Sequence, residues 1–177
     1  MTREQLEHAI RAACDVSGDN EVYIFGSQAI LGEYPEAPAS LRQSIEVDVS
    51  PVNKPDASIT IDGALGERSL FHQTHGFYVH GVSLESAVLP NGWKSRTNEV
   101  HDYIDPEKTG HCVESHDLAA SKLMAFREKD TEFVRQLLVE EMISSEKLLA
   151  RLKAVDNHEE QKERAINWIK RTAKELD

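Results

Sequence analysis

The sequence predicts an α/β (α+β) fold, in which a small mixed β-sheet with helices is followed by a helical C-terminal half. Two observations favour this class. Before residue 115, short apolar runs alternate with turns that contain glycine and proline, a pattern typical of strands and loops. From Ser115 onward glycine and proline are absent and apolar residues recur at helical spacing. We therefore expect two domains, an α/β core over residues 1–112 and a helical subdomain over residues 113–177.

The first elements have clear start and stop signals. Thr2-Arg3-Glu4-Gln5 is a capping-box pattern, and the apolar residues that follow it predict a helix that ends near Ser17-Gly18. Residues 21–25 are typical of a short strand. Residues 26–32 indicate a turn that opens into a brief helix, and Pro35 and Pro38 then predict an irregular segment.

The middle of the chain gives less uniform signals. A strand is expected at residues 44–50, a loop at 51–56, and a second strand at 77–82. Residues 59–76 remain unassigned, with helical hints at 67–72; residues 89–93 form a turn and residues 94–103 are a possible strand. Four helices follow, and we expect them at 116–128, 131–142, 145–155 and 158–175.

Composition limits the kind of protein. A chain of 177 residues with 40% hydrophobic and 29% charged residues is typical of one well-packed domain, or of a small domain with a helical appendage. Neither a signal peptide nor an apolar stretch of membrane-spanning length is evident, which predicts a cytoplasmic protein without a membrane partner. Cys14 and Cys112 are too few for a disulfide framework, and we expect reduced, non-catalytic thiols.

The net charge of −11 argues against broad, sequence-independent DNA binding, which needs clustered Lys and Arg. It does not exclude a small anionic substrate, because a nucleotide bound with Mg²⁺ brings its own countercharge. The charge therefore restricts partners more than chemistry.

Glu46 and Asp48 are the most informative pair. Alternation along a strand directs both carboxylates to one face and Ile45, Val47 and Val49 to the other. Neighbouring carboxylates repel unless a cation lies between them, and Mg²⁺ prefers such oxygen ligands. Taken alone, the strand favours the simpler interpretation of an amphipathic edge strand with a solvated acidic face.

Gly26-Ser27 follows the first strand and precedes the expected brief helix. Small residues and free backbone N–H groups at such a turn allow a phosphate to approach, and the Ser27 hydroxyl adds a donor. The same dipeptide also occurs at strand-to-helix turns for conformational reasons alone.

Lys122 lies in an apolar stripe formed by Leu118, Ala119, Ala125 and Phe126. A lysine in that position either extends to the helix edge or meets an anion, which can be a carboxylate or a phosphate. Asp130 is expected as the N-cap of the next helix, because a new periodic run begins after it.

Histidines concentrate between residues 72 and 116, which raises the possibility of a structural zinc site with His72 and His75 as its closest pair. His80 differs from these because it lies inside the strand at 77–82. Alternation places His80 on the same face as Tyr78 and Val82, or toward the Glu46 and Asp48 site if the strand is bulged.

Three groups of residues together carry a resemblance. They are Phe25-Gly26-Ser27, Glu46-Val47-Asp48, and the helical elements Asp117-Leu118, Ser121-Lys122-Leu123, Ala125 and Arg127 to Asp130. On these residues the sequence resembles the nucleotidyltransferase superfamily that includes DNA polymerase β. It is similar in particular to bacterial AbiEii and MenT toxin-type enzymes and to related uncharacterised nucleotidyltransferases. The resemblance covers residues 22–138, and the helical motif is the more specific one.

The resemblance implies that Glu46 and Asp48 hold Mg²⁺ or Mn²⁺, that Gly26 and Ser27 cradle the triphosphate, and that Lys122 contacts a nucleotide phosphate. Asp130 is implied as a supporting or catalytic residue.

The implied activity is transfer of a nucleotidyl group from an NTP to an RNA, protein or small-molecule acceptor. A role as the toxin of a toxin–antitoxin or phage-defence pair, with a cognate antitoxin as partner, is also implied. The sequence departs from the family pattern at Glu46, where aspartate is more usual, and at His80, where a third carboxylate is common. Because of these departures, the alternative is a catalytically degenerate nucleotide- or partner-binding protein of the same fold.

Overall fold

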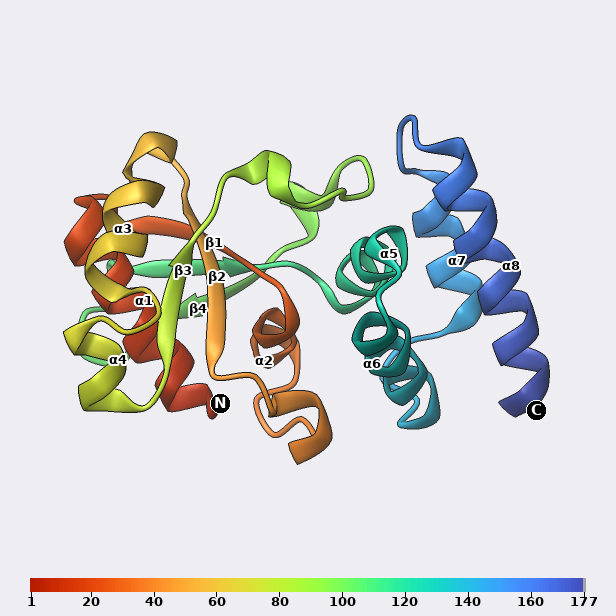
Figure 1. The fold of residues 1–177 in the computed structure, drawn as a ribbon, viewed down its shortest axis with the longest axis horizontal. Helices are drawn as coiled ribbons and strands as arrows, with labels where there is room; N and C mark the ends of the chain where they lie inside the picture. The colour runs from red at the N-terminus through yellow and green to blue at the C-terminus, as the bar shows by residue number, and fades with distance from the viewer. Residues whose placement is uncertain (177) are drawn as a thin grey trace. The chain divides into compact units, whose positions relative to one another are not determined.

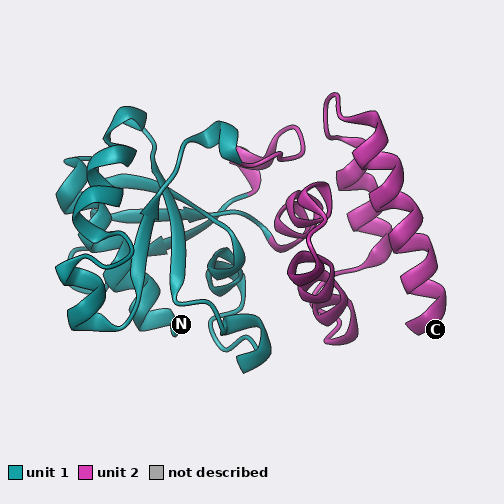
Figure 2. Ribbon diagram, in the orientation of Figure 1, with its two compact units in different colours: residues 1–86, 97–114 teal, residues 87–96, 115–177 magenta. Residues whose placement is uncertain are grey.

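The computed structural model describes residues 1–176 and divides the chain into two compact units (Figure 2). The first unit comprises Met1–Ser86 and Thr97–Glu114, and the second comprises Ala87–Arg96 and the chain from Ser115 onward. The first unit holds a mixed β-sheet with helices, and the second is helical. The predicted mixed α/β class with a helical C-terminal half is confirmed.

The sheet contains five strands in the order β3-β2-β1-β5-β4. Strand β1 pairs in antiparallel fashion with β2 and in parallel with β5, β2 pairs in parallel with β3, and β4 is antiparallel to β5. The strands are β1 (Glu21–Phe25), β2 (Glu46–Pro51), β3 (Tyr78–Gly81), β4 (Asn98–His101) and β5 (Thr109–Cys112).

One face of the sheet is apolar and packs against helices of the first unit. Val22, Ile24, Val47, Val49 and Val79 lie on this face and are fully buried. Helices α1 (Arg3–Ser17), α3 (Ser58–Leu65) and α4 (Leu70–His75) lie together on one side of the strands (Figure 1). The core of this unit lies between that helical layer and the apolar face.

Gly110 allows close packing of α1 on β5. A Cβ at this position would lie 2.4 Å from Ile10 Cδ1 of α1, too close for a real contact. Gly32 of the short helix α2 (Ile30–Glu33) similarly leaves room for Cys112, which is fully buried. Burial raises the pKa of both thiols, Cys14 and Cys112, to about 12, so both stay protonated at neutral pH.

The N-terminal helix follows its sequence signals. Thr2 caps α1 and exchanges hydrogen bonds with Gln5, and Gly18 ends the helix in the left-handed conformation at a φ of 64°. The predicted capping box and stop are confirmed.

The second unit contains α5 (Ser115–Ala125), α6 (Glu128–Val139), α7 (Ser145–Lys153) and α8 (Glu159–Leu176). Its fully buried side chains include Leu123, Leu137, Leu148, Leu152 and Ile169, which recur at helical spacing. The segment Ala87–Arg96 joins this unit because the Asn91 N–H donates to the Ala154 carbonyl at 2.8 Å and because Arg96 pairs with Asp117.

The predicted boundary between the first two C-terminal helices was wrong. Helix α5 ends at Ala125, because Phe126 adopts a positive φ of 56°, and α6 begins at Glu128. Asp130 is therefore not the N-cap. It occupies the third position of α6, and its carboxylate accepts a hydrogen bond from the backbone N–H of Arg127, which is the N-cap residue.

Two elements were absent from the sequence prediction. Helix α3 lies in the segment left unassigned, and β5 lies in a stretch where Gly110 and His111 obscure any apolar alternation. The possible strand at 94–103 is shorter than expected, since Trp93–Arg96 forms a 3-10 turn and only Asn98–His101 is a strand.

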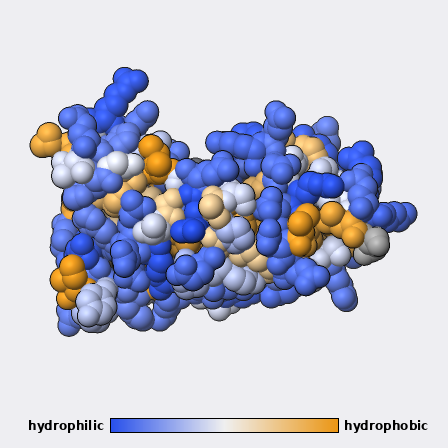
Figure 3. Space-filling view, turned by 90° about the horizontal axis from the view of Figure 1, so that it is seen from below, coloured by the Kyte–Doolittle hydropathy of each residue, from blue (hydrophilic) through white to orange (hydrophobic). Residues whose placement is uncertain are grey.

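Hydrophilic residues predominate on the face of the molecule seen in Figure 3, and apolar residues form separate patches there. This agrees with the 29% of charged residues. Within residues 1–176, no helix has the length and apolar character that crossing a membrane requires.

Candidate functional site

The second face of the sheet carries a group of three potential metal ligands, Glu46 and Asp48 on β2 and His80 on β3. The parallel register pairs Asp48 with His80 and Glu46 with Tyr78, so the three side chains lie on one face. The Nδ1 atom of His80 is 2.9 Å from Glu46 Oε1 and 2.9 Å from Asp48 Oδ1. One ligand atom from each residue lies within 4.8 Å of the other two. His80 thus stands beside the acidic pair without any bulge.

The group is accessible to solvent. The exposed fractions of the side chains are 36% for Glu46, 31% for Asp48 and 45% for His80. Burial lowers the pKa of His80, but the hydrogen bond to Asp48 and the charges of Asp48 and Glu46 outweigh burial and raise this pKa overall. The imidazole therefore carries a proton more readily than an isolated histidine and offsets part of the negative charge.

Tyr78 adds a further contact to Glu46. Burial, the charge of Glu46 and a hydrogen bond to Glu46 raise the pKa of Tyr78 to about 12. The phenol therefore stays protonated at neutral pH.

Gly26 makes room for the Asp48 carboxylate. Phe25 pairs with Asp48 across the antiparallel strands, so the next residue lies beside that side chain. Gly26 has φ 62° and ψ −168°, a conformation that is essentially restricted to glycine. A Cβ here would also lie 2.3 Å from Asp48 Oδ2. Conformation and space both require glycine at this turn.

Ser27 begins the 3-10 helix Ser27–Ala29 that follows Gly26. The next residue, Gln28, is fully buried, and its amide donates to the Ser44 carbonyl at 3.1 Å, just before β2. The Gly-Ser turn is thereby held against the strand that carries Glu46 and Asp48. The structure thus brings together four of the predicted site residues, Gly26, Ser27, Glu46 and Asp48.

Lys122 and Asp130 belong to the second unit and contact each other. Lys122 Nζ is 3.3 Å from Asp130 Oδ1 and lies 4.5 Å from the centre of the Phe133 ring. The Lys122 side chain is 10% exposed and Asp130 is fully buried. Arg127 Nε donates to Asp130 Oδ2 at 2.6 Å. Of the two anions considered for Lys122, the structure provides a carboxylate.

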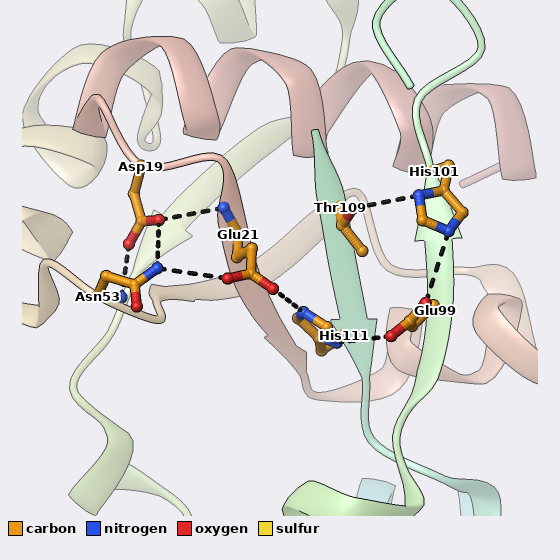
Figure 4. A network of polar contacts seen from close by, with 7 residues as sticks. All are labelled: Asp19, Glu21, Asn53, Glu99, His101, Thr109 and His111. Atoms are coloured by element: carbon orange, nitrogen blue, oxygen red, sulfur yellow. Dashed lines mark hydrogen bonds and ion pairs between the residues drawn. The ribbon is translucent and has the colours of Figure 1, made fainter. Parts of the chain in front are cut away.

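A second polar network occupies the same sheet face on β1, β5 and β4 (Figure 4). His111 Nε2 lies 3.0 Å from Glu21 Oε1, and His111 Nδ1 lies 3.9 Å from Glu99 Oε1. Glu99 Oε2 in turn lies 3.6 Å from His101 Nε2. The sequence did not indicate this network, because its residues come from three strands, one of which was missed.

The other histidines do not form a zinc site in the described part of the chain. His72 Nδ1 accepts a hydrogen bond from the Arg68 N–H at 3.0 Å, and the His75 ring packs 4.5 Å from that of His8. His116 accepts from the Ser144 N–H at 3.0 Å. Over residues 1–176, the single group of three or more potential ligands is that of Glu46, Asp48 and His80.

Comparison with known families identifies the chain's relatives. Residues 4–175 match a family described as a nucleotidyltransferase of unknown function (DUF6036). The chain belongs to this family. No curated protein and no solved structure matches it. The match supports the predicted nucleotidyltransferase superfamily, whereas the narrower resemblance to AbiEii and MenT enzymes stays a prediction.

Nucleotidyltransferases generally use divalent metal ions, and the donor set of this family member fits such an ion. Two carboxylate oxygens and one imidazole nitrogen converge on one accessible spot. The space left by Gly26 keeps Asp48 Oδ2 close to the turn. Sequence reasoning left the role of His80 open, since its position depends on the pairing of β3 with β2.

Proposed function

We propose that this chain is a metal-dependent nucleotidyltransferase that transfers a nucleotidyl group from an NTP to an acceptor. The observation that carries the proposal is the convergence of Glu46, Asp48 and His80 beside Gly26, in a chain that belongs to a nucleotidyltransferase family. In this proposal, the residues that bind the metal ion lie beside the glycine turn that the phosphates approach.

In this proposal Glu46, Asp48 and His80 hold a divalent ion, Mg²⁺ or Mn²⁺. When bound, such an ion neutralises charge on the triphosphate and orients the attacking and leaving oxygens. Gly26 leaves space beside Asp48, and Ser27 offers a hydroxyl and a backbone N–H to the phosphates. Tyr78 lies beside Glu46 across the paired strands. These residues bind and orient the substrate and supply no covalent intermediate.

Lys122 is proposed to contact a nucleotide phosphate as a point charge. Asp130 then acts as a positioning residue, because its contact with Lys122 Nζ leaves two of the three ammonium donors for other acceptors. Exchange of Lys122 for arginine and for methionine separates this role from packing. If the charge contacts phosphate, folded Lys122→Arg retains more nucleotide affinity than folded Lys122→Met, and equal affinity of the two folded variants would contradict this role.

The acceptor is proposed to be RNA, a protein or a small molecule, and the biological role to be that of a toxin neutralised by a cognate antitoxin. The net charge of −11 makes a broad nucleic-acid surface unfavourable, so an RNA acceptor would be recognised locally. Expression of the chain with and without neighbouring genes tests this role through cell growth.

The direct test of activity is incubation of the full chain with labelled NTPs, Mg²⁺ or Mn²⁺ and candidate acceptors. Asp48→Asn should reduce transfer by about 100-fold or more, as expected when a contact to the metal is removed. The matched control is Glu99→Gln, a carboxylate on the same sheet face outside the three-residue group. Equal activity of Asp48→Asn and Glu99→Gln would contradict the proposal.

The alternative is a nucleotide-binding protein that has lost catalysis. The observation that favours it is His80 at a position where superfamily members commonly have a carboxylate. Calorimetry distinguishes the two functions, because a degenerate protein binds NTP in the presence of a divalent metal ion without forming product.

A further inference from the structure

We propose that the site of Glu46, Asp48 and His80 binds first-row transition-metal ions such as Co²⁺ and Zn²⁺ more tightly than Mg²⁺, and that His80 sets this preference. The inference rests on the proposed function in that it concerns the same site. It concerns the identity of the metal ion and not the transfer reaction.

The position of His80 is fixed by its strand. Val79 is fully buried on the opposite face, and the register pairs Val79 with Val47 and His80 with Asp48. Gly81 packs so closely against α3 that a Cβ there would lie 1.9 Å from the Ser58 carbonyl oxygen. Rotation of the strand would expose Val79 and force Gly81 out of this contact, so the imidazole stays on the face of the carboxylates.

The nitrogen atoms of His80 are arranged as in a ligating histidine. Nδ1 faces the two carboxylates at 2.9 Å, whereas Nε2 lies 4.0 Å from Asp62 Oδ1 of α3. Metal-bound histidines usually donate their second ring N–H to a carboxylate or carbonyl, which fixes the tautomer. Asp62 is on the Nε2 side of the ring, since α3 packs directly beside β3, although its carboxylate is beyond direct hydrogen-bonding distance. The arrangement leaves Nδ1 as the atom that binds the ion.

The donor set favours transition metals on chemical grounds. Mg²⁺ prefers oxygen ligands in octahedral geometry and gives up its waters reluctantly. Imidazole suits Zn²⁺ and its first-row neighbours, and the affinity of mixed nitrogen and oxygen sites rises from Mn²⁺ toward Co²⁺ and beyond. Replacement of a carboxylate by His80 also removes one negative charge from the ligand set. Both changes weaken Mg²⁺ binding relative to Co²⁺ and Zn²⁺.

The site can hold an ion and still admit substrate. The three ligands come from two adjacent strands and each is about one-third or more exposed, at 36%, 31% and 45%. Catalytic metal sites typically use three protein ligands and keep a position open for water or substrate. The preference for transition metals therefore applies to an ion that can still contact a phosphate.

The test measures binding of Co²⁺ and Mg²⁺ to the full chain after chelator treatment, without nucleotide, by titration calorimetry and visible absorption. We expect Co²⁺ to bind at least about 100-fold more tightly than Mg²⁺, and His80→Asp to reduce this ratio by about 10-fold or more. His101→Asp is the matched control, since His101 lies on the same polar face outside the group, and it should leave the ratio unchanged.

Equal affinities in the wild-type protein, or an unchanged ratio in His80→Asp, would overturn the inference. Pulsed EPR of the Cu²⁺-loaded wild-type protein gives a readout that needs no variant to fold, and the absence of imidazole nitrogen coupling would also overturn the inference.

The two proposals fail separately. Binding of Co²⁺ through His80 without any transfer removes the proposed function and leaves the metal preference intact. Transfer in a protein that binds Co²⁺ and Mg²⁺ with equal affinity removes the metal preference and leaves the proposed function.

Discussion

The carboxylates of the candidate site and two buried carboxylates of the second unit differ in how their charge is compensated. In the second unit, Asp117 is fully buried and lies 2.7 Å from Arg96 Nε and 3.0 Å from Arg151 Nε. Asp130 is equally buried, between Arg127 and Lys122. In the first unit, Glu46 and Asp48 share one nitrogen of His80 and are about one-third exposed, at 36% and 31%.

This difference distinguishes structural carboxylates from those that we propose to bind an ion. A buried carboxylate must be paired and hydrogen-bonded, and one that is flanked by two cations has little capacity left for a metal ion. Two exposed carboxylates that share a histidine retain oxygen atoms for such an ion. The residues identified in the sequence include carboxylates of both kinds, and in the structure Asp117 and Asp130 are buried and paired within their own unit.

Removal of a buried carboxylate should have the largest effect on stability. Asp117→Ala should lower the free energy of unfolding by about 3–5 kcal/mol, because Arg96 and Arg151 are left without their shared partner. Urea denaturation followed by circular dichroism measures this. A loss below about 1 kcal/mol, the size of a surface pair, would show that Asp117 is not structural.

Gly26→Ala tests the link between the turn and Asp48. The substitution should cost about 1–3 kcal/mol of stability, because the conformation of Gly26 disfavours any side chain. It should also weaken metal binding, since the new Cβ would collide with Asp48 Oδ2. Denaturation and calorimetry measure the two effects. Gly63→Ala is the control, because a Cβ there meets nothing within 4 Å.

Acid pH tests the pairing of Asp130. Burial acts to raise the pKa of this carboxyl, but hydrogen bonds and charge from Arg127 and Lys122 outweigh burial and lower it. A lowered pKa in the folded state stabilises the fold above the unfolded value of about 3.9, and this stabilisation is lost as pH falls through the folded pKa. Below about pH 4, wild-type stability should therefore decline more steeply with pH than that of Asp130→Asn. Parallel pH slopes in thermal melts would contradict the pairing.

Removal of an exposed carboxylate should have the smallest effect on stability. Asp48→Asn should change the free energy of unfolding by no more than about 0.5–1 kcal/mol, since the variant loses a contact with His80 and also a repulsion with Glu46. The same variant should lose the stabilisation that added Co²⁺ gives the wild-type protein in thermal melts. Severe destabilisation without metal would place Asp48 among the structural carboxylates.

Features that depend on neighbouring residues in the chain could be predicted from the sequence. Alternation correctly directed Glu46 and Asp48 to one face of β2, and the capping signals correctly bounded α1. Contacts between segments that are distant in the chain could not be predicted from these local patterns. The position of His80 beside Asp48 depends on parallel pairing of two strands, and the need for glycine at position 26 depends on the register of β1 with β2.

The partner of Lys122 was missed for a different reason. Asp130 has the residue type and spacing of an N-cap, and the positive φ of Phe126 that ends α5 early is unusual for a large aromatic side chain. Once the helix ends there, Asp130 moves into the first turn of α6 and meets Lys122. Strand β5 was missed because it contains Gly110. Glycine is required there by the close packing of α1, but it is not a residue that favours strands.

Binding of a metal ion by Glu46, Asp48 and His80 is tested most directly by an anomalous difference map from crystals of the full chain grown with Co²⁺. We expect a peak bonded to one oxygen of Glu46, one oxygen of Asp48 and Nδ1 of His80, at distances of about 2.0–2.2 Å. A map in which the only peaks lie elsewhere, with His80 still between the two carboxylates, would contradict it.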